Sequence, residues 1–536
     1  MPRHYMMALV LAGGVLAGCK TGPDYVRPNV DVPSKWSSAR EGGEADKPAA
    51  VTEWWTTLND PVLNDLIGRS VEANFDLRMA EARVREARAA RGIVAADLWP
   101  NVGISGSYAH SQSTESKSQS GGVATTLGAG LSPLGVNRNV TLRNQNASVT
   151  RSVTGFGAGA ARATSVSLTP NSSQTPGRTS DLFQAWFDAS WELDIFGGNR
   201  RAVEAADATI DAAEDARRGV VLSLLSEVAL NYIDLRATQS RLAITHKNIA
   251  AQAASVTLTR DRFQAGLTSE LDAVRAESLL ATTQSQLPAL ESHIQGAIHG
   301  LGVLMGKDPG ALLEELSTAA PMPAAPGEVP VGLPSDLLRR RPDIRQSERE
   351  LAAATARIGE AMADLFPKFS LTGAFGGKSG DLGNVFSNAN QLWSLGSTVR
   401  WPLFDAGRIR ANINVQNARQ EQAAIAYEKS IMTALEDVEN ALVAFAKEQV
   451  RRDLLDKAVK ANEHAVRLAN ERYVQGLESF LSVLTAQQQL FQTEDQLVQS
   501  QSFVLTDLVS LYKALGGGWE THEPQEPDTA KSKPTR

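Results

Sequence analysis

The chain has 536 residues, of which 42% are hydrophobic and 21% are charged. Its 53 Lys and Arg residues against 60 Asp and Glu residues leave a formal net charge of −7, which argues against a nucleic-acid-binding protein because that function needs a basic face. The single cysteine excludes an intramolecular disulfide and a zinc site built from several cysteines. Beyond residue 18 no apolar run is long enough for a transmembrane helix.

The N-terminus has a short basic start, an apolar stretch over Met6–Leu16, and then Ala-Gly before Cys19. The stretch is too short to span a membrane, and a signal peptidase requires small residues before its cleavage point. The pattern resembles a bacterial lipoprotein signal, which predicts a signal peptide over 1–18 and covalent N-palmitoyl and S-diacylglycerol groups on Cys19. An ordinary signal peptide with an incidental cysteine is the alternative. Lys20 favours the outer membrane over retention in the inner membrane.

The rest of the chain is duplicated. The segment Ala96–Pro100 (ADLWP) recurs 267 residues later as Ala363–Pro367 (ADLFP), and Arg262–Leu267 (RFQAGL) recurs 210 residues later as Arg472–Leu477 (RYVQGL). The smaller offset means that the first copy carries 57 extra residues, which we place in a Ser-, Thr- and Gly-rich segment over 111–180. We expect this insertion to be an external loop with little fixed structure. A separate binding domain is the alternative.

Both copies predict the same elements in the same order. A helix of 22 residues (76–97 or 343–364) ends before a proline, and two segments of alternating apolar and polar residues follow. The alternating apolar residues include Val102, Ile104 and Tyr108, then Phe183, Phe187 and Trp191, and in the second copy Phe369, Leu371 and Phe375, then Trp393, Leu395 and Val399. About ten residues of alternation is the length of a membrane-crossing β-strand. A soluble hairpin packed on a core is the alternative.

Proline-free stretches over 200–262 and 410–472 predict helices about 95 Å long at 1.5 Å per residue. Their apolar residues recur with 3-4-3 spacing, which predicts coiled-coil seams at Leu225, Val228, Tyr232 and Leu235 and at Leu435, Val438, Leu442 and Phe445. Shorter helices over 268–305 and 478–514 return. We expect each long helix to pack against two short helices stacked end to end, with the connecting segments at their waist.

These elements predict the domain order. It runs through a lipoprotein signal peptide (1–18), an N-terminal anchor and equatorial segment (19–75), a first repeat (76–306), a proline-rich equatorial linker (307–342), a second repeat (343–515) and a disordered tail (516–536). We expect the arginine run over 339–341 to be a solvated helix start. Four strands cannot close a barrel in a membrane without leaving backbone groups unsatisfied, so copies must associate. Two copies would supply eight strands and three would supply twelve.

The lipoprotein signal followed by Cys19–Pro28, the paired Leu-Trp-Pro and Leu-Phe-Pro segments and the Gly-Leu turns resemble the TolC-like outer-membrane efflux channels, in their lipoprotein (NodT-type) branch. The resemblance covers about residues 16–515 apart from the insertion. It implies a mainly α fold with a small β part, in a homotrimer with a 12-stranded β-barrel and a 12-helix periplasmic α-barrel. It also implies a passive, non-enzymatic duct that a periplasmic adaptor opens and an inner-membrane pump supplies. A non-conducting coiled-coil scaffold or adaptor and a protein-secretion duct are the alternatives.

The resemblance assigns site residues as well. The adaptor-docking tips match Gly266, Leu267, Thr268, Gly476, Leu477 and Glu478, and the periplasmic gate matches Asp272 and Tyr473. The family's gate arginine aligns with Glu478, and an aspartate one turn further on is replaced by Thr485. An Asp272–Glu478 pair would repel, so either other partners close this gate or the gate is looser than in the family. We expect no catalytic residues, no metal and no dissociable cofactor.

Overall fold

The computed structural model of the chain describes residues 20–37, 44–45, 52–113, 147–148, 169–170, 178–326, 329–330 and 334–522. The predicted signal peptide, Cys19, most of the insertion and residues 523–536 lie outside the described residues. The chain divides into two compact units. A helical unit comprises residues 1–99, 194–368 and 400–536, and a strand unit comprises residues 100–193 and 369–399.

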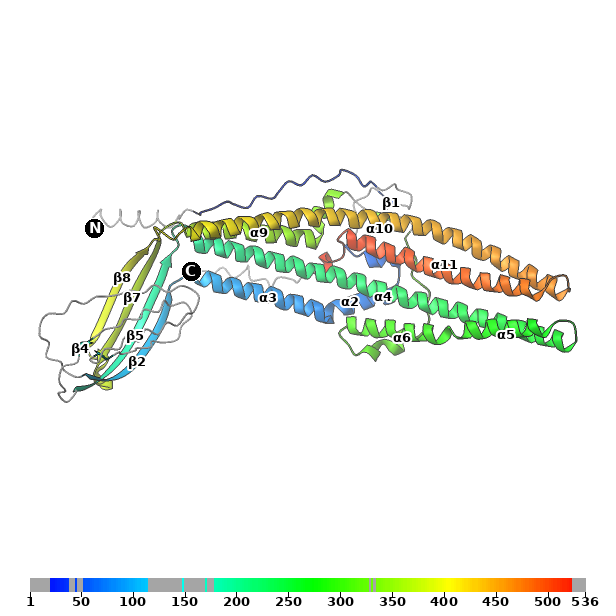
Figure 1. The fold of residues 1–536 in the computed structure, drawn as a ribbon, viewed down its shortest axis with the longest axis horizontal. Helices are drawn as coiled ribbons and strands as arrows, with labels where there is room; N and C mark the ends of the chain where they lie inside the picture. The colour runs from blue at the N-terminus through cyan, green and yellow to red at the C-terminus, as the bar shows by residue number, and fades with distance from the viewer. Residues whose placement is uncertain are drawn as a thin grey trace, which may run out of the picture. The chain divides into compact units, whose positions relative to one another are not determined.

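Two helices of 67 residues each, α4 and α10, form the frame of the helical unit (Figure 1). The helix bounds are α2 Pro61–Ala73, α3 Phe75–Ala96, α4 Gly198–Gln264, α5 Glu270–Gln284, α6 Leu287–Leu304, α7 Leu313–Leu316, α8 Leu337–Arg340, α9 Pro342–Ala363, α10 Arg408–Val474 and α11 Phe480–Ala514. Helix α4 packs against α3, α5 and α6, and α10 packs against α9 and α11. The predicted pairing of each long helix with shorter ones is therefore confirmed. Helix α4 also contacts α9 and α11, which joins the two repeats.

The first returning helix is not continuous, contrary to the single helix expected over 268–305. It breaks at Ser285 and Gln286 into α5 and α6. Pro288 stands in the first turn of α6, where its missing N–H and its ring would interrupt a continuous helix but fit a new helix start. No helix in the described ranges is both long enough and apolar enough to cross a membrane.

The predicted seams form the core between the helices. Leu225, Val228, Tyr232 and Leu235 are at most 1% exposed, and Val438, Leu442 and Phe445 are buried in the same cluster. Short 3₁₀ helices and a small strand pair complete the waist: η1 Trp54–Leu58, η2 Pro309–Leu312, η3 Pro334–Asp336, η5 Glu520–His522, and β1 Glu44–Ala45 parallel to β6 Val329–Pro330. A further 3₁₀ helix, η4 Leu382–Asn384, belongs to the strand unit and lies between two of its strands. Trp54 stacks on Tyr512 with ring centroids 5.4 Å apart, so η1 is held against α11.

Two expectations about the waist are wrong in part: Arg339 of the arginine run is exposed as expected, but the last arginine of the run is not. Arg341 is buried rather than solvated, because it forms ion pairs with Asp343 and Asp437 and donates to the carbonyl of Ala514 at 3.1 Å. The described start of the tail, over 516–522, is packed rather than disordered. Its Trp519 is 6% exposed and donates its indole N–H to the carbonyl of Arg340 at 3.0 Å. An aromatic ring of this size supplies enough buried area to hold the segment in place.

The strand unit is a four-stranded sheet in the order β2-β5-β7-β8. The bounds are β2 Asn101–Ser113, β5 Arg178–Leu193, β7 Lys368–Ser379 and β8 Gln391–Arg400, with a separate pair of β3 Ala147–Ser148 and β4 Thr169–Pro170. Strand β5 pairs antiparallel with β2 and with β7, which joins the two copies in one sheet. Among the described residues, β2 and β8 each have one neighbour and are the edges of the sheet.

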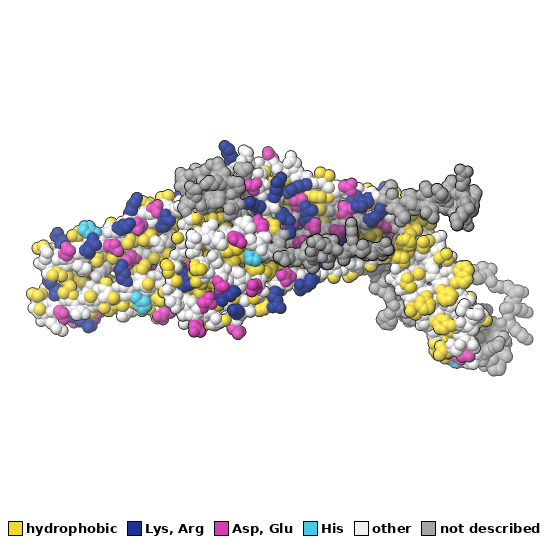
Figure 2. Space-filling model, turned by 180° about the vertical axis from the view of Figure 1, so that it is seen from behind, with side chains coloured by type: hydrophobic (Ala, Val, Ile, Leu, Met, Phe, Trp, Pro, Cys, Tyr) yellow, Lys and Arg dark blue, Asp and Glu magenta, His cyan; other side chains and the backbone are white. Residues whose placement is uncertain are grey.

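The register of the sheet gathers apolar side chains on one face. Ile104 lies opposite Phe187, and Phe187 lies opposite Phe375. Most of this face is solvent-exposed in the single chain, including Ile104 at 77% and Leu395 at 79%. Figure 2 shows hydrophobic side chains clustered over the strand unit. An exposed apolar face of this extent indicates contact with lipid or with another protein surface.

One half-buried acid in α11, Asp507, predicts a pH-dependent stability. Burial and the nearby carboxylate of Glu448 raise the pKa of Asp507 to about 6, against about 3.9 in an unfolded chain. The folded chain therefore holds this proton more tightly, so the contribution of Asp507 to stability is present below about pH 4 and is lost as the pH rises through about 6. We expect Asp507→Asn to raise the thermal unfolding midpoint more at pH 7.5 than at pH 5.

The matched control is Asp456→Asn, because Asp456 is an exposed carboxylate on α10 that pairs with Lys460. Thermal scans of both variants in detergent at the two pH values measure the effect. An equal change at pH 5 and pH 7.5 for Asp507→Asn would contradict the assignment.

Candidate functional site

The first helical hairpin turns between α4 and α5. Helix α4 ends in a Schellman motif, in which the amide of Gly266 donates to the carbonyl of Phe263 at 2.9 Å and the amide of Leu267 donates to the carbonyl of Arg262 at 2.8 Å. Gly266 has a φ of +71°, in the region that favours glycine. The side chain of Leu267 is exposed at 67%, so this turn presents an apolar residue to its surroundings.

The second hairpin, between α10 and α11, has the same turn. The amide of Gly476 donates to the carbonyl of Tyr473 at 3.0 Å, and the amide of Leu477 donates to the carbonyl of Arg472 at 2.9 Å. Gly476 has a φ of +73°, and Leu477 is 64% exposed. The repeat in the sequence has therefore produced two turns of one geometry, each with an exposed leucine after its glycine.

The two residues assigned to a gate lie in different hairpins and make separate contacts. Tyr473 is 3% exposed and packs its ring against Phe480 at a centroid distance of 5.3 Å. Asp272 accepts a hydrogen bond from the hydroxyl of Thr268 in its own hairpin. Among the described residues, no hydrogen bond or ion pair joins Asp272 to Tyr473.

Arg262 links the two turns instead, and sequence reasoning did not single it out. Its guanidinium lies 4.8 Å from the centre of the Tyr473 ring, within the range of a cation–π contact. It also donates to the carbonyl of Val474 at 3.2 Å. The only sequence feature that could have pointed to Arg262 is its match with Arg472 in the repeat. In the sequence the two arginines have equivalent positions, but in the structure Arg472 faces Glu478 of its own hairpin, with 3.7 Å between nitrogen and oxygen.

The residues that depart from the family pattern are satisfied locally. Glu478 accepts a hydrogen bond from the hydroxyl of Ser482 at 2.9 Å, in addition to its ion pair with Arg472. The hydroxyl of Thr485 donates to the carbonyl of Leu481 at 2.9 Å. Glu478 and Thr485 therefore make their contacts within the second hairpin. The two hairpins are joined instead by Arg262 and by side chains of α11.

Polar side chains join α4 to α11 further along the same two hairpins. Glu494 is 6% exposed and accepts from Lys247 at 2.8 Å and from Asn248 at 2.9 Å. The hydrogen bond to Glu494 raises the pKa of Lys247, so this lysine stays charged. Arg241 pairs with Asp495 at 2.6 Å. These contacts connect the first repeat to the second. A shift of α4 relative to α11 would break them.

The described residues contain no group of three or more His, Cys, Asp or Glu side chains that could hold a metal ion. The exposed leucines, the two glycine turns and the ties between hairpins suit contact with another protein and relative movement of the helices.

The repeats of the chain match a known family. Residues 66–307 and 333–517 match the model of the outer membrane efflux protein family. The chain belongs to this family. This outer membrane efflux protein is 30% identical to Nodulation protein T of Rhizobium leguminosarum bv. trifolii, over 94% of this chain and 96% of the relative. It is 32% identical to the probable efflux pump outer membrane protein TtgC of Pseudomonas putida, over 96% of each chain.

Solved structures show the same fold. The outer-membrane channel OprN is 32% identical, with a TM-score of 0.77 over 94% of this chain and 100% of that one. The MtrE outer membrane channel of Neisseria gonorrhoeae, in its open state, is 25% identical with a TM-score of 0.74, over 94% of this chain and 99% of that one. The predicted family, the mainly helical fold with a small sheet, the outer-membrane location and the role in efflux are confirmed for this efflux protein.

Proposed function

We propose that this efflux protein is the passive exit duct of a tripartite efflux system, and that three copies of it form the duct. The observation that supports the duct most directly is the open sheet. It has two unpaired edges, β2 and β8, and an exposed apolar face. In lipid, unsatisfied edges cost several kcal/mol per backbone group, so the sheets of neighbouring copies must pair until the barrel closes. Three copies supply twelve strands.

The lipid face of this barrel is the face that carries Ile104, Phe187 and Leu395, and the opposite face lines the lumen. Alternation along β8 places Leu395 on one face and its neighbour Ser394 on the other. The helical hairpins would then line a periplasmic tunnel. The mostly exposed polar residues of α10 suit a helix that faces water or another copy rather than a closed core.

Two further parts of the proposal concern anchoring and coupling. Cys19, with its N-palmitoyl and S-diacylglycerol groups, anchors the N-terminus in the outer membrane.

The turns at Gly266–Thr268 and Gly476–Glu478 dock a periplasmic adaptor through Leu267 and Leu477, and an inner-membrane pump supplies the energy. Opening consists of the two hairpins separating where Arg262 and Tyr473 now tie them. Asp272 lines the entrance from the first hairpin. The chain carries out no reaction of its own.

The test of the duct exploits the alternation in β8. We expect Leu395→Arg to prevent assembly into the membrane, because an arginine on the lipid face of a barrel costs about 2–4 kcal/mol near the bilayer midplane. The matched control, Ser394→Arg, places the same charge on the lumen face and is expected to assemble. Heat-modifiable oligomers in outer-membrane extracts measure assembly, and planar-bilayer recordings measure conductance.

The outcomes separate the duct from its alternatives. A non-conducting scaffold has no lipid-facing strands, so equal behaviour of the two variants and no conductance for the unmodified protein would reject the duct. A protein-secretion duct of the same architecture would conduct but would not lower the accumulation of small toxic compounds in cells. Accumulation assays in cells that lack the gene distinguish this last case.

A further inference from the structure

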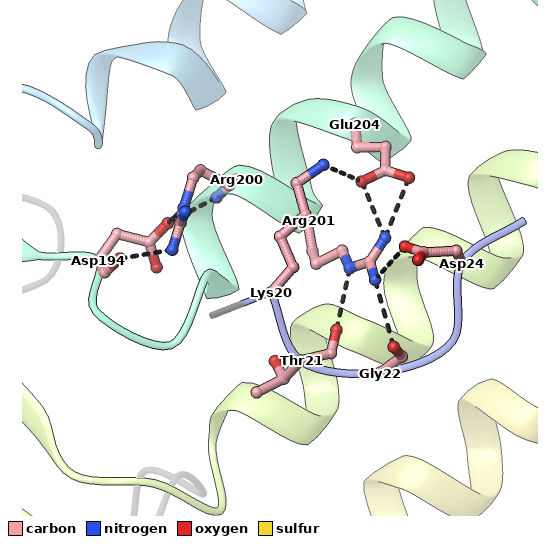
Figure 3. Close-up of polar contacts among 8 residues, drawn as sticks. All are labelled: Lys20, Thr21, Gly22, Asp24, Asp194, Arg200, Arg201 and Glu204. Atoms are coloured by element: carbon pink, nitrogen blue, oxygen red, sulfur yellow. Dashed lines mark hydrogen bonds and ion pairs between the residues drawn. The ribbon is translucent and has the colours of Figure 1, made fainter. Parts of the chain in front are cut away.

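The first described residues, Lys20–Asp24, contact Arg201 on α4, and this arginine uses all of its side-chain donors. The guanidinium of Arg201, at 1% exposure, donates from Nε to the carbonyl of Thr21 at 2.9 Å, and from Nη2 to the carbonyl of Gly22 at 3.2 Å and the carboxylate of Asp24 at 2.7 Å (Figure 3). Its Nη1 donates to both carboxylate oxygens of Glu204, at 3.1 and 2.9 Å. A guanidinium has five N–H donors, so none is left over.

The segment fits this place closely. Gly22 has a φ of +82°, and a Cβ at this residue would lie 2.4 Å from the Cα of Gly359 on α9. A Cβ on Gly359 would in turn lie 2.7 Å from the carbonyl oxygen of Thr21. The amide of Thr21 donates to the carbonyl of Phe196 at 3.2 Å. The contact therefore requires glycine on both sides and holds the backbone of residues 21 and 22 in one register.

Glu204 makes a second contact with the same segment. Its carboxylate pairs with the ammonium group of Lys20 at 3.1 Å, as Figure 3 also shows. The position of Arg201 itself is set by the start of α4. There Asp194 accepts from the amides of Asn199 and Arg200, which caps the helix and fixes its first turn.

The second repeat lacks this arrangement, although its long helix begins in the same way. Gly197 precedes α4 with a φ of +79°, and Gly407 precedes α10 with a φ of +85°. At the repeat offset of 210, however, Arg201 corresponds to Ala411 and Glu204 corresponds to Asn414. A pair of charged residues present in one repeat alone is not needed for the shared helix start. In the first repeat this pair has a separate role, and the residues it holds are Lys20–Asp24.

We propose that Arg201, Glu204 and Gly359 form an intramolecular docking site for Lys20–Asp24. The site ties the N-terminal end of the mature chain to the joint between α4 of the first repeat and α9 of the second. The role in anchoring rests on the proposed acylation of Cys19. Because Cys19 is bonded to Lys20, an acyl group there would begin one residue from the docking site, about 3.8 Å along the backbone, with no flexible linker between membrane anchor and folded chain.

Trypsin provides the test, since it cleaves after Lys20 only if the segment leaves its site. Lys35 is exposed and serves as an internal reference, and the bond after Arg27 precedes a proline and resists trypsin. The ratio of peptide 21–35 to the uncut N-terminal peptide, measured by mass spectrometry on the purified full chain, reports release of the segment. We expect Arg201→Met to raise this ratio at least about tenfold, because it removes the three hydrogen bonds from Arg201 that hold the segment and so favours local opening.

Gly22→Ala tests the same contact from the side of the segment and leaves α4 unchanged, so it keeps the test valid if Arg201→Met folds poorly. It is expected to raise the ratio to a similar extent. The control is Arg88→Met, which removes an exposed ion pair with Glu214 between α3 and α4 and is expected to leave the ratio unchanged. Unchanged protection of Lys20 in both Arg201→Met and Gly22→Ala would overturn the proposal.

Cys19→Ser separates docking from anchoring. If the native chain carries an acyl mass that Cys19→Ser lacks, and this variant stays protected at Lys20, both the docking site and the acyl anchor stand. If no acyl mass is found on the native chain and Lys20 stays protected, the anchoring proposal fails while the docking site stands. If Cys19→Ser exposes Lys20 and Arg201→Met does not, the protection comes from lipid, and the docking site is rejected.

Discussion

Export is expected to fall to the level of a deletion strain when Leu267 and Leu477 are both changed to Asp. The two leucines follow the glycines of the helical turns and are 67% and 64% exposed, so the substitutions disturb no core contact. Their place in the proposal is contact with the adaptor, and burying a carboxylate in an apolar interface without a partner costs several kcal/mol. A loss of 3 kcal/mol in docking corresponds to a roughly 150-fold weaker complex.

The assay is the minimum inhibitory concentration of exported compounds, combined with the amount of assembled channel in the outer membrane. The control is Leu382→Asp, because Leu382 is 68% exposed in the turn between β7 and β8 and has no part in the proposed docking. Assembly is expected to be normal in both the double variant and the control. Normal export by the Leu267→Asp, Leu477→Asp chain would show that the turns are not the docking site.

Arg262→Ala is expected to act in the opposite direction and to leave the periplasmic end open. Arg262 contributes a cation–π contact with Tyr473 and a hydrogen bond to the carbonyl of Val474, and both cross from one hairpin to the other. Contacts of these kinds are worth about 1–2 kcal/mol each, so the loss of both shifts the closed-to-open equilibrium of each copy by roughly 30-fold to 10³-fold. Single-channel conductance in planar bilayers measures the shift.

Arg260→Ala is the control for this variant. Arg260 lies on the same helix two residues away, but its ion pair is with Glu277, within the first hairpin, at 2.6 Å. It is expected to conduct like the unmodified channel, and Arg262→Lys is expected to be intermediate because an ammonium group keeps the charge but loses the planar stacking. Equal conductance of Arg260→Ala and Arg262→Ala would remove Arg262 from the gate.

The sequence predicted the helices and the strands because periodicity and proline positions report them directly. The seams at Leu225 and Phe445 were visible as 3-4-3 spacing, and the strands as alternation around Phe187 and Leu395. Contacts between distant parts of the chain were not visible. Arg341 was expected in solvent because an arginine run is usually solvated, and its burial depends on Asp437, almost a hundred residues away.

The candidate site shows the same limit. The glycine turns were predicted with their exposed leucines, since a Gly-Leu pair at a helix end has a local cause. The partner of Tyr473 was not predicted. Arg262 and Arg472 occupy equivalent positions in the two repeats, and only the packing of α4 beside the end of α10 determines which guanidinium reaches the ring.

The break at Ser285 and Gln286 makes the two hairpins mechanically different. The returning arm of the first hairpin has a joint about midway, between α5 and α6, while the returning arm of the second, α11, runs unbroken for 35 residues. A push on the turn at Gly476 is therefore carried along a stiff lever to the waist, where α11 meets Trp54. A push on the turn at Gly266 meets a joint in the returning arm, so in this hairpin only α4 is an unbroken helix. A duplicated chain has in this way acquired one rigid arm and one compliant arm.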